Sequence, residues 1–406
     1  LNGRALPRPL REGFPDLLEI EIGEAILLRL GEIRQPFGDL PLLSAVLRVG
    51  REDIDSGLRP VGSLRERIES LVSSPFDLLC LTSDYDPERL CYPTTEAVPA
   101  VHRFLVEGKI RHRFSIVASG GIRSAADTQK TVQRGANGVK IDWPLLLTLD
   151  PHARQKVGRG ESVTIYHDSS TLAKRITNLV KVWNIQIIEV LGASGFKDIK
   201  KTVGEENRLL IFDDLEERVY DILHSRERIE RNRQQNRLRI EKEFDLAGFG
   251  WRYSQLRDMM KPVPSPHRFC DIHLPPSCHK IFDRDHVWPA SLIASVARMA
   301  AGDRKTLFLG YGENKGNLGD GFDAISLRFR EDPDRIPEER LDGVSTAVRL
   351  SPLLQTKTPF MGAGMSVGSI GPGTWRARVR ATRALGTQLD TGEGGYPTIF
   401  ILDSNW

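Results

Sequence analysis

The sequence has few of the features that mark membrane, secreted or nucleic-acid-binding proteins. Its 406 residues contain no apolar run of about eighteen residues, the length that a transmembrane helix needs. Leu1–Pro15 mixes Arg, Pro and Glu without an apolar core, unlike a secretory signal. The 57 basic and 54 acidic residues nearly balance, and the net charge of +3 gives no argument for nucleic-acid binding. We therefore expect a cytoplasmic protein with neither a membrane nor a nucleic acid as partner.

Cysteine is also scarce, with four residues in the whole chain, which is too few for a disulfide framework and fits a reducing compartment. Cysteine and histidine gather in one stretch, at His267, Cys270, His273, Cys278, His279 and His286. Their spacing contains no Cys-x2-Cys pair, and Pro275 and Pro276 interrupt it. We expect an irregular loop without metal here, with a zinc site as the alternative.

Short apolar runs alternate with helical patterns, which favours a parallel α/β arrangement. The predicted strands are Leu17–Ile22, Leu43–Val49, Phe76–Thr82, Phe114–Ala118, Gly138–Ile141, Thr306–Gly310, Phe360–Met361 and Thr398–Leu402. The predicted helices include Leu64–Val72, Thr94–Glu107, Ala125–Arg134, Ser291–Ala301 and Trp375–Leu385.

The middle of the chain, from Ser170 to about Phe244, reads as almost purely helical and strongly charged. Residues 226–239 hold six arginines against two glutamates. A solvated helix that links two halves of a fold explains this run, and a surface for RNA or a protein partner is the alternative. The stretch Asp245–Pro266, rich in Gly and Pro, reads as a linker.

Two glycine-rich loops near the end of the chain carry the most specific signal. The first loop reads Gly362-Ala-Gly-Met-Ser-Val-Gly368, and one helix later comes the second, Asp390-Thr-Gly-Glu-Gly-Gly395. Small residues after a strand let a flat ring lie against the backbone, whose N–H groups can donate to it. Glu393 is then an accessible carboxylate between glycines.

A third loop lies in the first half of the chain, where Ser119-Gly-Gly-Ile-Arg-Ser124 follows a strand and precedes a helix. In α/β barrels, such turns bind phosphate through backbone N–H groups and a helix N-terminus. Gly120, Gly121 and Ser124 suit that role. The alternative is a turn of the same shape that binds nothing.

Together these loops resemble the flavin domain of glutamate synthase. The resemblance implies a TIM-type (β/α)8 barrel that binds FMN, whose reduced form delivers hydride to an imine formed from 2-oxoglutarate and ammonia. It implies that Gly364, Met365 and Ser366 face the flavin together with Gly120, Gly121 and Ser124. It also implies that Glu393 lies at the substrate as the catalytic carboxylate.

The order of the loops differs from that of the family, where the Met-Ser loop comes first. This implies a circularly permuted barrel with an inserted helical linker. Its segments would be 1–155 (family C-terminal half), 156–245 (charged helices), 246–290 (linker with the Cys/His cluster) and 291–406 (family N-terminal half). No cysteine lies between Trp143 and Phe212, so an iron–sulfur cluster is not expected, and no glutaminase region is present.

Some ligand positions also differ from the family. Asp142 and Trp143 stand where a glycine loop would approach the phosphate, and Asp390 replaces an Asn. A carboxylate beside a phosphate is repulsive by about 4 kcal/mol at an effective dielectric near 20. Lys140 would help only if its side chain pointed into the barrel, which the pattern leaves open.

The sequence thus predicts an FMN-dependent oxidoreductase of amino-acid nitrogen metabolism that acts on a small molecule. A barrel that has lost flavin and serves as a scaffold or subunit is the alternative, and a barrel for another phosphorylated ligand is a third reading. A protein partner or a homo-oligomer is expected in either of the first two cases.

Overall fold

The computed structural model places most of the barrel-like segments of the chain. It describes residues 17–23, 42–74, 76–85, 92–154, 168–206, 209–211, 288, 290–302, 322, 325–327, 336–352, 354–365 and 370–392. The predicted strands Thr306–Gly310 and Thr398–Leu402, the Arg-rich run 226–239, the linker 245–266 and the Cys/His cluster lie outside these residues.

A parallel sheet of six strands forms the centre of the fold, which confirms the predicted α/β class. Its order is β1-β2-β3-β4-β5-β10. The strands are β1 (Leu17–Glu21), β2 (Leu42–Arg48), β3 (Leu78–Thr82), β4 (Ser115–Ser119), β5 (Gly138–Ile141) and β10 (Phe360–Gly362). Each corresponds to a predicted apolar run, because strands buried on both faces are nearly continuous in apolar residues.

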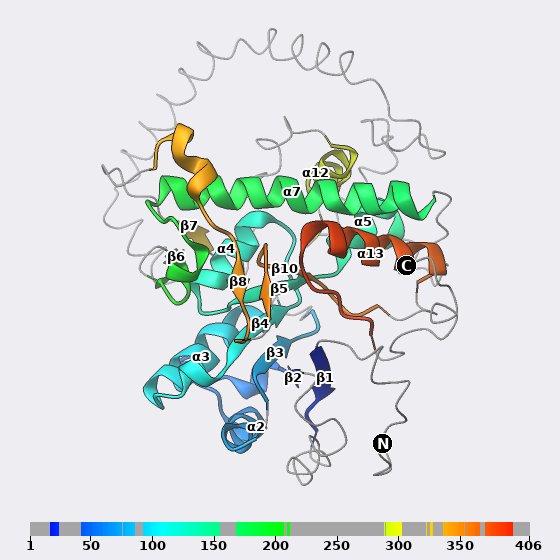
Figure 1. Cartoon of the computed structure of the whole chain (residues 1–406). Coiled ribbons are helices and arrows are strands. Elements are labelled where there is room, and N and C mark those ends of the chain that lie inside the picture. Colours follow the sequence, from blue (N-terminus) through cyan, green and yellow to red (C-terminus); the bar gives the residue numbers. More distant parts are fainter. Residues whose placement is uncertain are drawn as a thin grey trace, which may run out of the picture.

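Helices connect and cover the strands (Figure 1). They are α2 (Gly62–Val72), α3 (Thr94–Glu107), α4 (Ala125–Gln133), α5 (Trp143–Leu149), α7 (Ser169–Ala193), α12 (Ala290–Ala301) and α13 (Pro372–Leu385). Short 3-10 turns span Arg51–Asp53, Arg111–Arg113, Ile199–Thr202 and Glu338–Gly343. The predicted bounds of α3 are confirmed, and α5, which was not predicted, follows β5 directly.

Between α7 and residue 211 the chain is less helical than predicted, and the rest of the predicted helical segment lies outside the described residues. After α7, the chain makes a 3-10 turn at Ile199–Thr202 and then strand β6 (Leu209–Ile211). This strand pairs with β7 (Ile325–Leu327) in an antiparallel ribbon, and a second ribbon joins β8 (Val348–Arg349) to β9 (Gln355–Thr356). Strand β6 could not be predicted from the sequence, because a strand of three residues carries little periodic signal and its neighbours in the sequence are charged.

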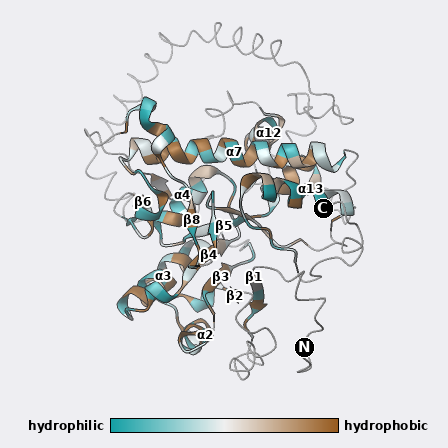
Figure 2. Ribbon diagram, viewed as in Figure 1, coloured by the Kyte–Doolittle hydropathy of each residue, from teal (hydrophilic) through white to brown (hydrophobic). Residues whose placement is uncertain are grey.

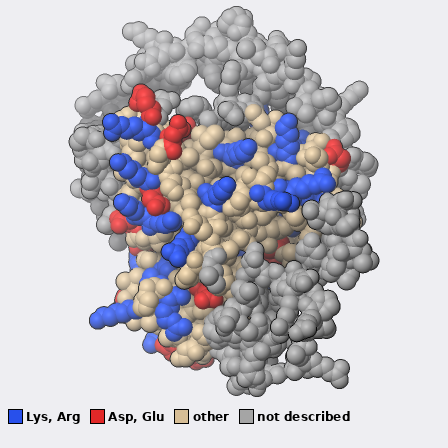
Figure 3. Space-filling model, in the orientation of Figure 1, with Lys and Arg blue, Asp and Glu red and all other residues tan. Residues whose placement is uncertain are grey.

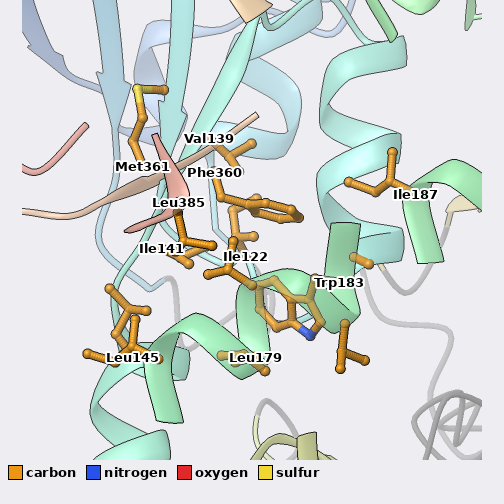
Figure 4. Close-up of a cluster of buried hydrophobic side chains, with 14 of the residues drawn as sticks. Ile122, Val139, Ile141, Leu145, Leu179, Trp183, Ile187, Phe360, Met361 and Leu385 are labelled. Carbon is orange, nitrogen blue, oxygen red and sulfur yellow. The ribbon is translucent and has the colours of Figure 1, made fainter. Parts of the chain in front are cut away.

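Helix α7 is a central packing element. Asp168 caps its first turn by accepting hydrogen bonds from the N–H groups of Ser170 and Thr171. Hydrophobic and hydrophilic residues alternate along the helix (Figure 2), and its apolar side packs on α12, α13 and α5. Trp183, 1% exposed, lies with its ring 5.5 Å from that of Phe360 in β10 (Figure 4). This core therefore joins residues of the first, middle and last thirds of the chain.

A second apolar cluster lies on the other face of the first four strands. There β2 and β3 contribute Leu43, Leu47 and Leu79, which are buried against α2 and α3. The sheet is thus covered on both faces, as parallel sheets require. No helix in the described part of the chain combines the length and apolarity that a membrane crossing would need.

Candidate functional site

The predicted loops all follow the carboxyl ends of strands, which in a parallel sheet lie at one edge. The Gly120-Gly121 turn follows β4, Asp142 follows β5, and Gly364 and Met365 follow β10. Because β5 lies between β4 and β10, these three connections are neighbours. The structure therefore brings together loops that are about 240 residues apart in the sequence.

The glycine turn after β4 requires glycine at both positions. Gly120 has a φ of +103° and Gly121 a φ of +76°, which other residues rarely adopt. Ser124 then caps α4, and its hydroxyl accepts from Asp127 N at 3.1 Å. The Asp127 carboxylate in turn accepts from Arg123 N at 3.1 Å. The turn and the start of α4 thus form a rigid unit in which Ser124 serves the helix.

The aromatic ring of Tyr92 covers this turn. A methyl group placed on Gly121 would lie 2.8 Å from Cδ2 of that ring, and one on Gly120 would lie 3.2 Å from Cδ1. Burial, with the nearby Asp142 carboxylate second, raises the pKa of Tyr92 to about 12. Tyr92 therefore stands close to both the end of β4 and the end of β5, where a barrel holds phosphate.

Asp142 has a structural role that the sequence did not reveal. It is the N-cap of α5, and its Oδ1 accepts a hydrogen bond from Trp143 N at 2.5 Å. Burial raises its pKa, which the Trp143 N–H partly opposes. The ring of Trp143 packs under the guanidinium of Arg154, at 5.3 Å. The pair Asp142-Trp143 thus begins a helix in place of a glycine loop.

The stretch Thr387–Gly392 runs alongside β10. Gly362 N donates to Gln388 O, and Asp390 N donates to Gly362 O, both at 3.0 Å. Asp390 Oδ1 also accepts from Gly392 N at 2.8 Å. The beginning of the Asp-Thr-Gly-Glu-Gly-Gly loop is therefore held in a strand-like position beside β10.

The side chain of Lys140 points away from the apolar core and binds two carboxylates. Its Nζ donates to Glu19 of β1 and, over 2.7 Å, to Asp390 Oδ2. The three side chains, which we call the lysine–dicarboxylate cluster, are 8%, 17% and 23% exposed for Lys140, Glu19 and Asp390. This settles the orientation of Lys140 that the sequence left open.

This contact also shows that the sheet is strongly curved. In a flat sheet, β1 and β5 would be four steps of about 4.8 Å apart, or roughly 19 Å. Side chains from the two strands could not then meet at hydrogen-bond distance, yet Lys140 and Glu19 do. The strands must curl so that their inner faces look toward one another.

The charges within the cluster are unequal. Burial, the largest effect, raises the pKa of Glu19 to about 7; Lys140 opposes this and Asp390 adds to it. Burial also works against the charge on Asp390, but Lys140 and hydrogen bonds to its carboxylate lower its pKa to about 2. Burial disfavours the charge on Lys140 too, yet the neighbouring acidic groups raise its pKa. Of the two carboxyl groups, Glu19 therefore binds a proton before Asp390 does as the pH falls.

Arg378 ties the two family loops together from α13. The residue is 1% exposed, and its guanidinium donates to Ala363 O, to Met365 O at 3.2 Å and to Asp390 O at 3.5 Å. Burial lowers its pKa to about 10. One side chain thus binds backbone carbonyls on both sides of the helix that separates the loops.

The predicted site residues are placed to different degrees. Gly364 lies beside Asp390, whose Oδ2 would be 2.9 Å from a methyl group added to the glycine. Met365 is half-buried next to it, whereas Ser366 and Glu393 lie outside the described residues. Sequence reasoning missed Glu19 and Arg378; the only signal for Glu19 was the alternation Leu-Glu-Ile-Glu in an otherwise apolar strand.

Comparison with known proteins finds a matching family model and several similar sequences. The family model described as the conserved region in glutamate synthase matches residues 87–197 and 294–402, together more than half of the chain. Similar proteins include the archaeal glutamate synthase [NADPH] of Methanocaldococcus jannaschii, 32% identical over 127 residues. The archaeal-type glutamate synthases [NADPH] of Dehalococcoides mccartyi and Thermotoga maritima are 34% and 33% identical over the same length.

Each of these alignments covers 29% of this chain and 25% of the relative, so the chain matches about a quarter of the length of these proteins. No solved structure matches the chain significantly.

Proposed function

Because the chain belongs to the family of the conserved region of glutamate synthase, we propose that it is an FMN-binding oxidoreductase domain of amino-acid nitrogen metabolism. The observation that carries this proposal is the meeting of the Gly120-Gly121 turn, the Gly364-Met365 loop and Asp390 at neighbouring strand ends. Glutaminase and iron–sulfur parts would have to come from elsewhere.

The backbone of the Gly120-Gly121 turn suits the phosphate group of a flavin. The turn of Gly120 and Gly121, which have positive φ angles, lies directly before the N-terminus of α4, a favourable place for an anion. The ring of Tyr92 has to leave the turn before a phosphate can enter. Gly364 and Met365 would lie against the ring system, and bound FMN would supply the hydride transfer.

The exchanged order of the two halves is part of the proposal. The Met-Ser loop comes after the glycine turn in the chain, yet β10 pairs in parallel with β5 through Phe360–Val139 and Gly362–Ile141. Strand β10 therefore lies where the first strand of an unpermuted barrel would meet the last. This pairing supports a circular permutation.

Titration with FMN tests the proposal. We expect the purified chain to quench FMN fluorescence on binding and to give a yellow complex that dithionite bleaches. Gly121→Ala should weaken binding strongly, because a φ of +76° is strained for alanine and the turn can no longer keep the backbone shape that receives the phosphate. Gly62→Ala is the control, since Gly62 has a φ of +52° but faces open space. A chain that stays colourless with excess FMN would rule the proposal out.

Removing the Tyr92 ring should strengthen binding. We expect Tyr92→Ala to raise the affinity for FMN about tenfold, or about 1.4 kcal/mol, because the ligand no longer has to displace a buried ring. Isothermal titration calorimetry measures this difference. The control is Tyr85→Ala, because the ring of Tyr85 lies tilted against that of Tyr92, with 5.4 Å between the ring centroids, whereas the ring atoms nearest to the two glycines are those of Tyr92. Weaker binding by the Tyr92 variant would mean that the ring holds the ligand.

A barrel that has lost flavin and serves as a scaffold is the second candidate. The observation that favours it is that Tyr92 and the Asp142 carboxylate already occupy the space between the ends of β4 and β5. The FMN titration separates the two, and the same titration with other phosphorylated compounds tests a barrel with a different ligand.

A further inference from the structure

We propose that Lys140 is a positioning residue. By binding the carboxylate of Asp390, it fixes the start of the Asp390-Thr-Gly-Glu-Gly-Gly loop beside β5 and β10. The inference rests on the proposed function only for its consequence on ligand binding; the positioning itself is a property of the fold.

The geometry supports this role because Asp390 is the meeting point of three independent contacts. Its Oδ2 accepts from Lys140 at 2.7 Å, its Oδ1 accepts from Gly392 N at 2.8 Å, and its backbone carbonyl accepts from Arg378. Of these three contacts, only the one from Lys140 comes from outside the segment that carries β10, α13 and the loop. Lys140 thus links the loop to β5, while β10 and α13 lie on the loop's own segment of the chain.

The same contact explains the acidic residue at this position. An isolated buried carboxylate is strongly disfavoured, and the side chain of Asp390, which is 23% exposed, has the cation of Lys140 beside it. Lys140 in turn is almost fully buried and has Glu19, Asp390 and the Cys80 thiol as its charged or ionisable neighbours. The buried charges of Asp390 and Lys140 therefore stabilise each other, and Glu19 is the second acceptor for the ammonium group of Lys140.

The role of Glu19 differs from that of Asp390. Glu19 lies on β1, a strand that contributes no predicted ligand contact, and its carboxyl group contacts both Lys140 and the carboxylate of Asp390. Loss of Lys140 would remove the cation beside the buried carboxylate of Asp390, which favours a conformation in which Asp390 and the start of the loop move toward solvent. Loss of the Asp390 charge would release the loop and leave the Lys140–Glu19 pair intact.

Hydrogen–deuterium exchange of the peptide spanning residues 387–392 tests the inference without any ligand. We expect Lys140→Met to speed exchange of this peptide about tenfold and D390N about threefold, as the hydrogen bond of Asp390 N to Gly362 O opens more often. The double variant should exchange no faster than D390N alone, because Lys140 acts through Asp390. Lys140→Arg, which keeps a cation, should restore most of the protection.

Effects of Lys140→Met and D390N that simply multiply in the double variant would overturn the inference, since Lys140 would then act through Glu19 alone. If Lys140→Met does not fold, the exchange of the two single variants and the double variant can be compared in the Glu19→Gln background, where no unpaired carboxylate remains on β1. FMN titration of the same variants adds the functional arm, with affinity expected to fall as exchange rises. If the wild type does not bind FMN but the variants show the expected exchange rates, the proposed function is refuted and the positioning role of Lys140 stands. If all variants exchange at the same rate, the positioning role is refuted, and the FMN titration alone decides the proposed function.

Discussion

Replacing Arg378 by Met should lower the free energy of unfolding by about 3 kcal/mol, the largest loss that we expect from a single site residue. The guanidinium donates to carbonyl groups of Ala363, Met365 and Asp390, and it is 1% exposed. Methionine fills similar space but leaves these buried acceptors without their donor. The gain from no longer burying a charge offsets only part of this loss. Urea denaturation followed by circular dichroism measures the difference.

Arg380→Met is the matched control, because Arg380 lies two residues further along α13, is exposed and, among the residues that the structure describes, donates to Ser169 Oγ at 2.8 Å. Basic side chains of this kind spread over the face of the molecule that carries α7 and α13 (Figure 3). Replacing one of them should change stability by less than about 0.5 kcal/mol. Equal losses in the two variants would mean that the loops do not depend on Arg378.

Arg378 also illustrates what the sequence could not reveal. Four arginines occur in Pro372–Leu385, at 376, 378, 380 and 383, and such a helix reads as a charged surface element. The buried one differs only in what lies opposite it, namely carbonyl groups of loops that precede and follow the helix. Those partners are set by tertiary packing, so no local pattern distinguishes Arg378 from its neighbours.

The strands could be predicted far better than the site. Runs such as Leu42–Arg48 and Leu78–Thr82 are apolar on both faces, so their pattern does not depend on knowing which side packs against which helices. Whether Lys140 points inward does depend on it, because shifting a strand by one residue exchanges its faces. The glycine turn was readable for a similar reason: Gly120 and Gly121 have backbone angles that only glycine adopts easily.

The helix after β5 was missed for a different reason. The family resemblance presents Asp142 and Trp143 as replacements for a glycine loop, and their charge and size alone do not indicate a helix start. In the structure Asp142 caps α5, with Pro144 in the first turn, as at many helix starts. The helix-start signal Asp-x-Pro was present, but α5 is only seven residues long and its apolar residues show little periodicity.

Stability of the protein should also depend on pH through Glu19, because this carboxyl keeps its proton in the fold to a pH of about 7. In the unfolded chain the same group ionises near its ordinary pKa of 4.5. Between these values the unfolded state releases a proton that the folded state retains, so stability falls as pH rises through this window. Asp390 acts in the opposite sense and lower down: its pKa of about 2 means that its contribution is lost as pH falls below about 4.

Glu19→Gln isolates the first effect, since an amide resembles the protonated carboxyl and can still accept from Lys140. We expect the variant and the wild type to be equally stable near pH 4.5, and the variant to be more stable at pH 8 by on the order of 3 kcal/mol. Thermal unfolding at several pH values from 4.5 to 8 measures the difference. Glu21→Gln on the same strand is the control, because Glu21 is exposed and pairs with an exposed Arg48 at 3.5 Å. If Glu19→Gln lowered stability at pH 8, the carboxylate would be ionised there and would stabilise Lys140, and the cluster would be an ordinary buried salt bridge.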